Sequence, residues 1–398
     1  MSEWVKTTLN EIADVIGGGT PSTKNEAFWG GEIPWITPKD LTGYTKMYIS
    51  HGERFITKNG LDNSSTRLLP EGTVLMSSRA PIGYVAIAAN PITTNQGFKS
   101  LVPNTELANN KFLYFWIKNN KQYIDSLGSG TTFAEVSGSV VKSLEIELPS
   151  LAEQKAIASV LSSLDNKIDL LHRQNKTLES IAETLFRQWF VEEVDDSWIL
   201  SSIGEVFDIK GGATPSTKES LFWNGNINWT SPRDLSGAKS IYLLSTERKI
   251  TELGLSKISS GLLPNNTLLM SSRAPVGYLA ITDIELAINQ GYIAILEHEI
   301  FGCEYMYLWC KVNMDIIKNS ANGSVFQEIS KASFKKIPFL IPDDERVKSF
   351  NKQGKILFKK IKSNTKNIQT LENLRDTLLP KLMSGEVRVN YTPEEIKQ

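Results

Sequence analysis

The sequence predicts an α+β fold in which two similar mixed α/β domains are joined by two long helices, packed as an antiparallel coiled coil with pseudo-two-fold symmetry. One observation is an internal repeat, because GGGTPSTKNEAFW at 17–29 returns as GGATPSTKESLFW at 211–223. The other is a heptad pattern of apolar residues in the segment that follows each globular copy along the chain. The repeat distance of 194 residues is domain-sized, far above the roughly 20–50 residues of solenoid repeats, so one domain is expected to occur twice.

The repeat sets the predicted domain boundaries. Each copy begins with short β-prone runs and turn residues and ends with a long segment that lacks them. The predicted segments are a first globular domain (1–150), a first long helix (151–197), a second globular domain (198–342) and a second long helix with a C-terminal tail (343–398).

Two local patterns recur inside the globular domains. The runs 73–89 and 267–283 read as strand, Pro-containing tight turn and strand. Apolar and aromatic residues at helical spacing predict a helix over 107–126, with Tyr123 on its apolar face, and a partner helix over 303–318. Each globular domain is therefore expected to mix helices and strands.

The heptad seam of the first long helix runs from Ile157 to Trp189 in alternating steps of four and three residues, with no glycine or proline inside it. The equivalent seam of the second helix runs from Phe350 to Leu382. We expect Pro380 and the following Ser384-Gly385 to end this helix. One segment is net acidic and the other net basic, so pairing with each other is favoured over packing of each helix on its own domain.

The polar residues within the seams predict the register of the helix pair. If facing residues have numbers that sum to 539, Asn175 lies opposite Asn364, and two asparagines can satisfy each other inside a coiled coil. The same register gives two apolar pairs, Leu171 with Ile368 and Trp189 with Phe350.

Composition excludes several classes of protein. No apolar run approaches the roughly 18 residues that span a bilayer, and the N-terminus is unlike a secretory signal. Two cysteines, Cys303 and Cys310, are too few for a disulfide framework, so a cytoplasmic location is expected. Three scattered histidines predict no metal site. The net charge of −1 predicts weak non-specific attraction to nucleic acid by this chain alone.

No catalytic signature is present. The chain lacks a G-x-x-x-x-G-K-[ST] loop and an N-P-P-[FY] motif, and GSGTTF at 128–133 lacks the third glycine of a dinucleotide fingerprint. Asp234, Glu247 and Lys249 could be imagined as a metal-dependent nuclease site, but Phe55 replaces the lysine in the first copy. We therefore expect a non-catalytic protein.

The repeated polar motifs instead have the chemistry of a DNA-binding surface. A Gly/Pro-rich loop with hydroxyls and one lysine suits phosphate oxygens, arginines in turns suit guanine edges or phosphates, and amides suit adenine. The candidate DNA-binding residues are Thr20, Ser22, Thr23, Lys24, Lys39, Lys46, Arg79, Asn95 and Gln96 in the first copy, and Thr214, Ser216, Thr217, Lys218, Arg233, Arg273, Asn289 and Gln290 in the second.

Each motif also has a structural interpretation. The TPSTK loop is compatible with a capped helix start, Arg79 with an internal ion pair, and Asn95-Gln96-Gly97 with a turn whose amides bond the backbone. The tryptophans near the loop favour a core role over base stacking. Residues that differ between the copies are where different readout is expected. Lys46, with Tyr44 and His51, has no chemical equivalent in the second copy.

Taken together, these motifs resemble the specificity subunit of type I restriction–modification systems. The resemblance rests on the repeated G-G-x-T-P-S and S-S-R-A-P-x-G-Y motifs, the Asn-Gln-Gly turn, LFRQWFVE at 185–192 and LLPKLMSGEVRV at 378–389. It implies two target-recognition domains that each read one half of a bipartite, gapped double-stranded DNA sequence, with the helices fixing the gap. It also implies docking of two methyltransferase subunits, which bring S-adenosylmethionine, and of endonuclease/translocase subunits. No cofactor is then expected in this chain.

The likeness of the two copies adds one expectation. In many relatives the two recognition domains are dissimilar, whereas here they are close copies, so related half-sites in inverted orientation are predicted. Two other classes stay open from the sequence: a stand-alone enzyme such as a nuclease, and a protein-binding adaptor or antirestriction decoy without DNA affinity.

Overall fold

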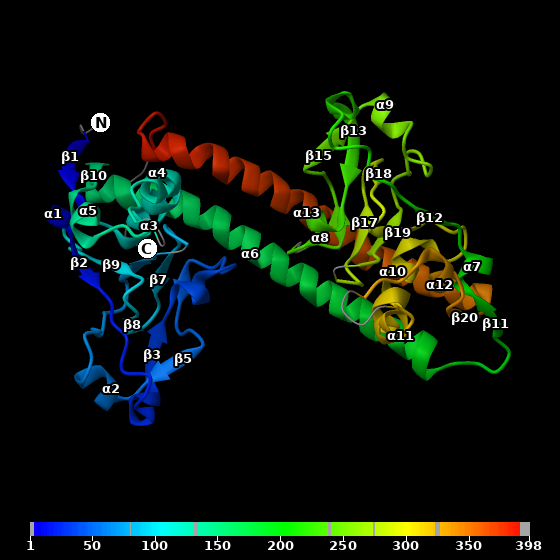
Figure 1. Ribbon diagram of the computed structural model, residues 1–398, viewed down its shortest axis with the longest axis horizontal. Helices are drawn as coiled ribbons and strands as arrows, with labels where there is room; N and C mark the ends of the chain where they lie inside the picture. Colours follow the sequence, from blue (N-terminus) through cyan, green and yellow to red (C-terminus); the bar gives the residue numbers. More distant parts are fainter. Residues whose placement is uncertain are drawn as a thin grey trace. The chain divides into compact units, whose positions relative to one another are not determined.

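The computed structural model describes residues 4–79, 81–130, 134–237, 240–273, 275–322 and 327–390, and its chain forms two compact units (Figure 1). Unit 1 comprises Met1–Asp169 and Leu371–Gln398, and unit 2 comprises Leu170–Thr370. The divisions fall inside both long helices. Each unit therefore consists of one globular part together with a portion of each helix.

The globular part of unit 1 contains two sheets. The five-stranded sheet has the order β2-β9-β6-β7-β4, and the three-stranded sheet has the order β5-β3-β8. Its elements in chain order are β1 (Val5–Thr8), α1 (Leu9–Ile12), β2 (Ala13–Gly17), η1 (Glu26–Phe28), β3 (Trp29–Ile36), η2 (Pro38–Leu41), β4 (Tyr48–Ile49), β5 (Arg54–Ile56), α2 (Lys58–Asp62), β6 (Val74–Met76), β7 (Val85–Ala88), β8 (Thr93–Thr94), β9 (Lys99–Pro103), α3 (Asn110–Asn119), α4 (Lys121–Ser126), α5 (Gly138–Ser143) and β10 (Glu145–Leu148).

Unit 2 repeats this topology, with sheet orders β12-β19-β16-β17-β14 and β15-β13-β18. Its elements are β11 (Ile199–Ser202), α7 (Ile203–Val206), β12 (Ile209–Gly211), η4 (Ser220–Phe222), β13 (Trp223–Thr230), α8 (Pro232–Leu235), β14 (Tyr242–Leu243), β15 (Arg248–Ile250), α9 (Glu252–Leu255), β16 (Leu268–Ser271), β17 (Leu279–Thr282), β18 (Ala287–Ile288), β19 (Tyr292–Ile295), α10 (Gly302–Val312), α11 (Met314–Asn319), α12 (Lys331–Lys335) and β20 (Pro338–Ile341). The prediction of two similar mixed α/β domains is confirmed.

We call each three-stranded sheet with its loops the lobe of its unit. Within unit 1, β3, β5 and α2 lie at one end of the globular part, and α3 and α4 lie at the other end, beside α6 (Leu151–Arg187) (Figure 1). Within unit 2, β13, β15 and α9 lie at one end, and α10 and α11 at the other (Figure 1). Each lobe therefore lies at the end of its globular domain opposite to α3 and α4 in unit 1, or to α10 and α11 in unit 2.

The predicted strand–turn–strand runs are present as the antiparallel pairs β6–β7 and β16–β17. The predicted helices over 107–126 and 303–318 are each divided in two, as α3 with α4 and α10 with α11. Asparagine is the physical reason, because the Asn120 side chain donates to the Trp116 carbonyl and that of Asn313 to the Trp309 carbonyl, both at 2.9 Å. Beyond this break Tyr123 is 56% exposed, so its predicted place on an apolar face is wrong.

The two long helices extend beyond their heptad seams. Helix α6 covers 37 residues, about 55 Å at ~1.5 Å per residue, and continues into a π-helical turn over Gln188–Glu192. Helix α13 covers Asp344–Met383 and contains Pro380. The expectation that Pro380 ends this helix is wrong. Leu382 and Met383, just after the proline, are buried in the core of unit 1 and keep the last turn helical. The helix ends before Gly385, whose φ of 72° is left-handed.

Within unit 2 the helices pair in the predicted antiparallel register. The Asn364 side chain donates to Asn175 Oδ1 at 2.9 Å and also to Gln174 Oε1 at 2.9 Å. The rings of Trp189 and Phe350 lie 6.1 Å apart, edge to face. Leu171 and Ile368 are both buried. Asn175 and Asn364 are 7% and 0% exposed, so the polar pair is inside the seam.

Ion pairs join each globular part to its helices. In unit 2 Lys311 of α10 contacts Glu179 of α6 at 2.6 Å and Glu183 at 3.0 Å. Asp283 pairs with Lys362 and Lys366 of α13. Burial opposes ionisation of Asp283, but hydrogen bonds from the two lysines hold the pKa of its carboxyl below its usual value. The long helices of unit 2 therefore hold its globular part by charged contacts as well as by the core.

Unit 1 contains a further ion pair, which lies at the ends of its helices. Glu153, in the first turn of α6, is 3% exposed and accepts from Arg388 Nε at 2.5 Å and Nη2 at 2.8 Å. Unit 2 has a corresponding pair of reversed polarity, in which Arg346 of α13 contacts Glu193 at 2.6 Å. This second pair is more exposed, with 51% of the Glu193 side chain accessible.

Candidate nucleic-acid interface

The predicted DNA-binding loops, residues 20–24 and 214–218, are called the hydroxyl loops below. Each leaves a strand at a point where only glycine fits. A Cβ on Gly18 would lie 2.0 Å from the Asn95 carbonyl oxygen, and one on Gly212 would lie 2.0 Å from the Ile288 carbonyl oxygen. The Gly-Gly-Gly and Gly-Gly-Ala sequences before the loops thus reflect close packing of backbone against backbone.

Two tryptophans hold the hydroxyl loop of unit 1. Trp35 Nε1 donates to the Gly19 carbonyl at 2.9 Å, and Trp29 Nε1 donates to the Ser22 carbonyl at 3.2 Å. Their rings meet edge to face with centroids 5.0 Å apart. The indoles therefore bond the loop carbonyls and leave the loop side chains free to face solvent.

Unit 2 repeats the arrangement closely. Trp229 Nε1 donates to the Ala213 carbonyl at 3.3 Å, Trp223 Nε1 donates to the Ser216 carbonyl at 3.1 Å, and the ring centroids are 5.1 Å apart. Trp35, Trp223 and Trp229 are buried, so they are core residues and not exposed stacking platforms.

The side chains of the hydroxyl loops are exposed in both units, namely those of Thr20, Ser22, Thr23, Lys24, Thr214, Ser216, Thr217 and Lys218. The loops are not capped helix starts, because the short helices that follow begin at Glu26 and Ser220 and are capped by Asn25 and Glu219. The structure thus presents three hydroxyls and one cation per loop on the surface of each lobe.

The Asn-Gln-Gly motifs form turns beside the loops. Asn95 Oδ1 accepts from the Gly97 N–H, and Asn289 Oδ1 accepts from the Gly291 N–H, both at 2.9 Å. Gln96 Oε1 accepts from Thr20 Oγ1 at 2.5 Å, and the equivalent bond from Thr214 to Gln290 is 2.6 Å. The exposed glutamines are therefore hydrogen-bonded to the hydroxyl loops, whereas the asparagine side-chain oxygens stabilise the turns.

Arg79 has an internal partner. Its guanidinium contacts Glu135 at 2.8 Å, and Lys99 contacts the same carboxylate at 3.1 Å. Partial burial opposes ionisation of Glu135, but hydrogen bonds from Arg79 and then Lys99 hold the pKa of its carboxyl below its usual value. The backbones of Arg79 and Glu135 also form an isolated β-bridge, and Arg273 forms the equivalent β-bridge with Glu328 in unit 2. The neighbouring Ala80 and Ala274, and residues 131–133 and 323–326 of the glycine-containing loops, lie outside the described residues.

Lys39 and Arg233 are exposed, and the acids that follow them are structural. Lys39 pairs with Glu53 at 3.1 Å, both largely exposed. Asp234 Oδ2 accepts from the Ser231 N–H at 2.8 Å and from Thr230 Oγ1 at 2.9 Å, which caps helix α8. A capping role accounts for the carboxylate that could have been imagined in a nuclease site.

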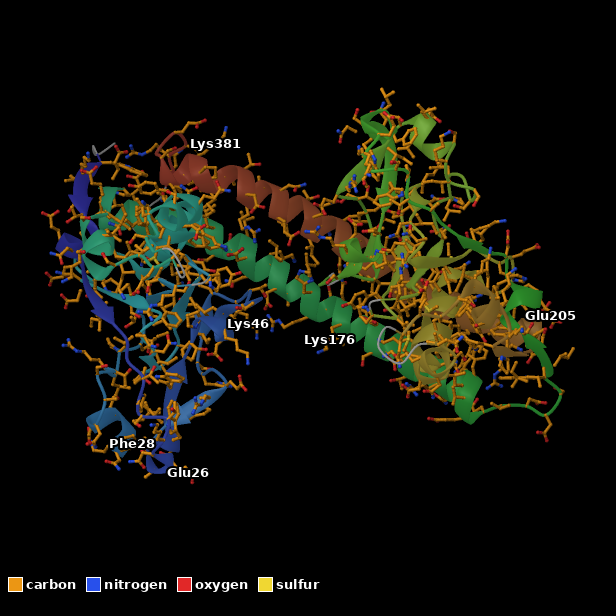
Figure 2. All side chains as sticks on the ribbon, in the orientation of Figure 1. Glu26, Phe28, Lys46, Lys176, Glu205 and Lys381 are labelled. Carbon is orange, nitrogen blue, oxygen red and sulfur yellow. The ribbon has the colours of Figure 1, made fainter. Side chains whose placement is uncertain are left out.

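The stretch that differs between the copies contains Lys46, which is exposed on the loop before β4 (Figure 2). Nearby, the Tyr44 hydroxyl donates to the Tyr48 carbonyl at 2.5 Å, and the His51 ring stacks on Phe55 with centroids 6.0 Å apart. At the position equivalent to Lys46, Ser240 instead contacts Thr365 of α13 at 3.1 Å. The two units therefore present different chemistry at this one place. Residues 238 and 239 of the second stretch lie outside the described residues.

One pair of exposed cations was missed by sequence reasoning. The Arg54 guanidinium lies over Trp29, 3.5 Å from the ring centroid, and Arg248 lies over Trp223 at the same distance. We call each tryptophan pair with its arginine a tryptophan–arginine cluster. The available signal was identity at the repeat distance. The strand pairing that brings Arg54 to the tryptophans, with Trp35 directly opposite Arg54, is not visible in the sequence.

The described residues contain no group of three or more His, Cys, Asp or Glu side chains able to hold a metal ion. Burial raises the pKa of both cysteine thiols, Cys303 and Cys310, which disfavours thiolate chemistry at either. Among the helices of the described part of the chain, none is long and apolar enough to cross a membrane. What the structure does present twice is a loop with hydroxyls and a lysine, bonded to a glutamine of the neighbouring turn.

The structure therefore defines a protein with an internal duplication, in which each of two similar units has a donor-rich surface and contains part of both long helices. The sequence matches the family described as the type I restriction modification DNA specificity domain over residues 1–180 and 195–377. Its relatives include the type I restriction enzyme MjaIX specificity subunit of Methanocaldococcus jannaschii, 34% identical, with 97% of this chain and 94% of that one covered. The HindI specificity subunit of Haemophilus influenzae is 22% identical over 97% of this chain and 100% of that one.

A solved structure shares the fold. The crystal structure of a type I restriction–modification S subunit from M. genitalium superposes with a TM-score of 0.60 at 19% identity, covering 98% of this chain and 97% of that one. The chain therefore belongs to the specificity subunits of type I restriction–modification systems, as the sequence motifs indicated. Such subunits are the non-catalytic DNA-recognition components of their complexes.

Proposed function

We propose that this chain reads a bipartite, gapped DNA target, one half-site per globular domain, within a type I restriction–modification complex. The observation that carries the proposal is the duplication of the hydroxyl loop with its tryptophan–arginine cluster. Hydroxyls, amides and cations on one surface match the donors that proteins direct at phosphates and base edges. Two copies of one surface on one chain suit a target with two half-sites.

The likeness of the two surfaces supports related half-sites in inverted orientation. The loop, its tryptophans and the stacked arginine match between the units within a few tenths of an ångström in the distances that define them. Residues common to both units cannot distinguish the half-sites. Unit 1 has Lys46 where unit 2 has Ser240, and this difference allows the two units to recognise different bases at one position. The proposed target is thus a near-palindrome interrupted by a gap.

The paired helices are proposed to fix the gap and to dock two methyltransferase subunits. Helix positions that are away from the seams carry exposed apolar side chains, which suits a partner surface. These residues are Leu170, Ile181, Ile356 and Leu374, between 44% and 69% exposed. The methyltransferase would bring S-adenosylmethionine, and endonuclease/translocase subunits would join the same complex in the cytoplasm.

The proposal is tested by the full-length chain, alone and with its methyltransferase partner, in a gel-shift assay on genomic duplex fragments. We expect sequence-selective binding by the complex and weak binding by the chain alone, because its net charge of −1 supplies little non-specific attraction. Cutting or methylation of DNA by the purified chain alone would show a stand-alone enzyme. A complex that assembles but binds no duplex would show an adaptor or decoy.

The role of the helices as a ruler predicts the effect of a heptad insertion. Seven residues that preserve the seam are inserted between Asp169 and Leu170 and, in register, between Gln369 and Thr370. Each helix then lengthens by about 10 Å, which corresponds to about three base pairs of duplex. We expect methylation of unchanged half-sites separated by a longer gap, measured by mapping methylated motifs. An unchanged gap would contradict the ruler.

A further inference from the structure

The guanidinium groups of Arg54 and Arg248 are presented in a way that points to a ligand. Arg54 lies 3.5 Å from the Trp29 centroid and 5.5 Å from that of Trp35, and Arg248 lies 3.5 Å and 5.4 Å from the equivalent rings. Stacking uses the face of a guanidinium, whereas its five N–H donors lie in the plane. The rings therefore fix the orientation of each arginine and leave its hydrogen-bonding edge available.

Within the described part of the chain, neither arginine has a hydrogen-bond acceptor or a carboxylate partner. This separates them from Arg79, which Glu135 neutralises, and from Lys39, which Glu53 contacts. Both arginines are exposed. A stacked cation without a protein acceptor among the described residues therefore occurs at equivalent positions of the two units.

The clusters are part of the same rigid piece as the hydroxyl loops. Trp29, which supports Arg54, also donates to the Ser22 carbonyl, and Trp223 donates to the Ser216 carbonyl beside Arg248. Glu26 and Phe28, just after the hydroxyl loop of unit 1, lie at the end of its lobe (Figure 2). Lys24 and Arg54 recur as Lys218 and Arg248.

Charge of the opposite sign is less regular in this part of the lobe. Glu26 and Glu32 of unit 1 correspond to Ser220 and Asn226 of unit 2, and Glu219 of unit 2 corresponds to an asparagine. The cations, the hydroxyls and the supporting tryptophans are common to the two lobes, and so are Glu53 and Glu247, of which Glu53 contacts Lys39 at 3.1 Å. An anion is the ligand that the stacked arginines and the exposed hydroxyls would accept.

We propose that Arg54 and Arg248 each bind a backbone phosphate of DNA and position the lobe on the duplex without reading bases. This inference rests on the proposed function. A planar fork held on an indole matches two phosphate oxygens, and the exposed hydroxyls of the adjacent loop supply further donors. Phosphate is favoured over a base edge because exposed hydroxyls of the adjacent loop lie beside each stacked arginine, and hydroxyls with a guanidinium are typical donors to phosphate oxygens.

The test compares salt dependence of binding for the methyltransferase complex carrying wild-type chain, Arg54→Gln, Arg248→Gln or the double variant. Affinities are measured by fluorescence anisotropy on a duplex with the target motif and on a scrambled duplex, across a range of KCl. Loss of one phosphate contact lowers the slope of log K against log salt by about 0.9. We expect about 0.9 for each single variant, about twice that for the double variant, and equal loss of affinity for both duplexes.

Two further variants separate the outcomes. Arg67→Gln removes an exposed arginine from the same domain that has glycine as its counterpart in the second copy, and we expect no comparable change in slope. Arg54→Lys keeps the charge, so most of the slope should return, and unchanged thermal unfolding verifies folding of every variant.

An unchanged slope in the double variant, or an equal change with Arg67→Gln, would overturn the inference while leaving the proposed function standing. Selective loss of affinity for the target duplex with an unchanged slope would assign the arginines to base readout instead, and would also overturn it. A wild-type complex that binds neither duplex would overturn both proposals.

Discussion

Arg388→Ala should destabilise unit 1 by about 3 kcal/mol or more, because it leaves the Glu153 carboxylate charged and unpaired in the core. Glu153 is 3% exposed, and Arg388 contacts both of its oxygens. Breaking a buried pair by removing one partner costs more than the pair itself contributes, since the remaining charge stays desolvated. Urea unfolding followed by circular dichroism, with the transition of unit 1 resolved, measures the change.

The reversed pair in unit 2 provides a matched control. Arg346→Ala removes an arginine from the equivalent helix end, but its partner Glu193 has a half-exposed side chain that water can solvate. We expect a much smaller change in the free energy of unfolding. Double substitution Glu153→Leu/Arg388→Leu should recover much of the stability lost in Arg388→Ala. Equal effects of Arg388→Ala and Arg346→Ala would contradict the assignment of a buried charge in unit 1.

Asn364→Leu should destabilise the helix pair of unit 2 by about 1–3 kcal/mol, because it deprives the buried Asn175 carbonyl of its donor. Asn175 is left with Thr365, 3.5 Å from its Nδ2, as a weak partner. The double variant Asn175→Leu/Asn364→Leu should be as stable as wild type or more stable. One reason is that it also removes Asn364 Oδ1, a buried atom without a hydrogen-bond partner among the described residues.

A double-mutant cycle by chemical denaturation measures this coupling. Asn373→Leu, at an exposed position of the same helix, serves as the control and should change stability by no more than a few tenths of a kcal/mol. Additive destabilisation by the two seam substitutions would show that the asparagines do not act as a pair.

The architecture could be predicted because it follows from two kinds of periodicity. The repeat at 194 residues required two similar domains, and the heptads with their asparagines determined which helix faces meet. The wrong predictions concern helix ends, where tertiary packing or a side-chain hydrogen bond overrides the local sequence rule. Pro380 forfeits one backbone bond, yet burial of Leu382 and Met383 keeps the helix going. Asn120 and Asn313 look like ordinary helical positions until their side chains bond the preceding turn.

The candidate site was accessible from the sequence only in part. Short motifs identify the hydroxyl loops because their residues are adjacent in the chain. The tryptophan–arginine clusters depend on pairing of β3 with β5, interrupted by an irregularity between Trp29 and Ile33, which brings both indoles near Arg54. Glu153 and Arg388 are 235 residues apart, so no local pattern relates them. Partner choice over such separations is decided by the fold.

The reversed polarity of the two helix-end pairs also bears on which helices pair with each other. Glu153 and Arg346 occupy equivalent positions of α6 and α13, yet carry opposite charge. In each unit the partner has the complementary sign, so pairing of α6 with α13 is favoured electrostatically over pairing of either helix with a copy of itself. The asparagine pair acts in the same direction, because Asn175 is equivalent to Ile368 and not to Asn364.

The two closely similar domains of this chain are proposed to read two related half-sites. The most direct measurement is the methylated motif in genomic DNA from cells that contain this chain and its methyltransferase, determined by single-molecule sequencing. We predict a bipartite motif with a non-specific gap whose two halves are related by inversion. Two unrelated half-sites, or one continuous motif without a gap, would contradict the account.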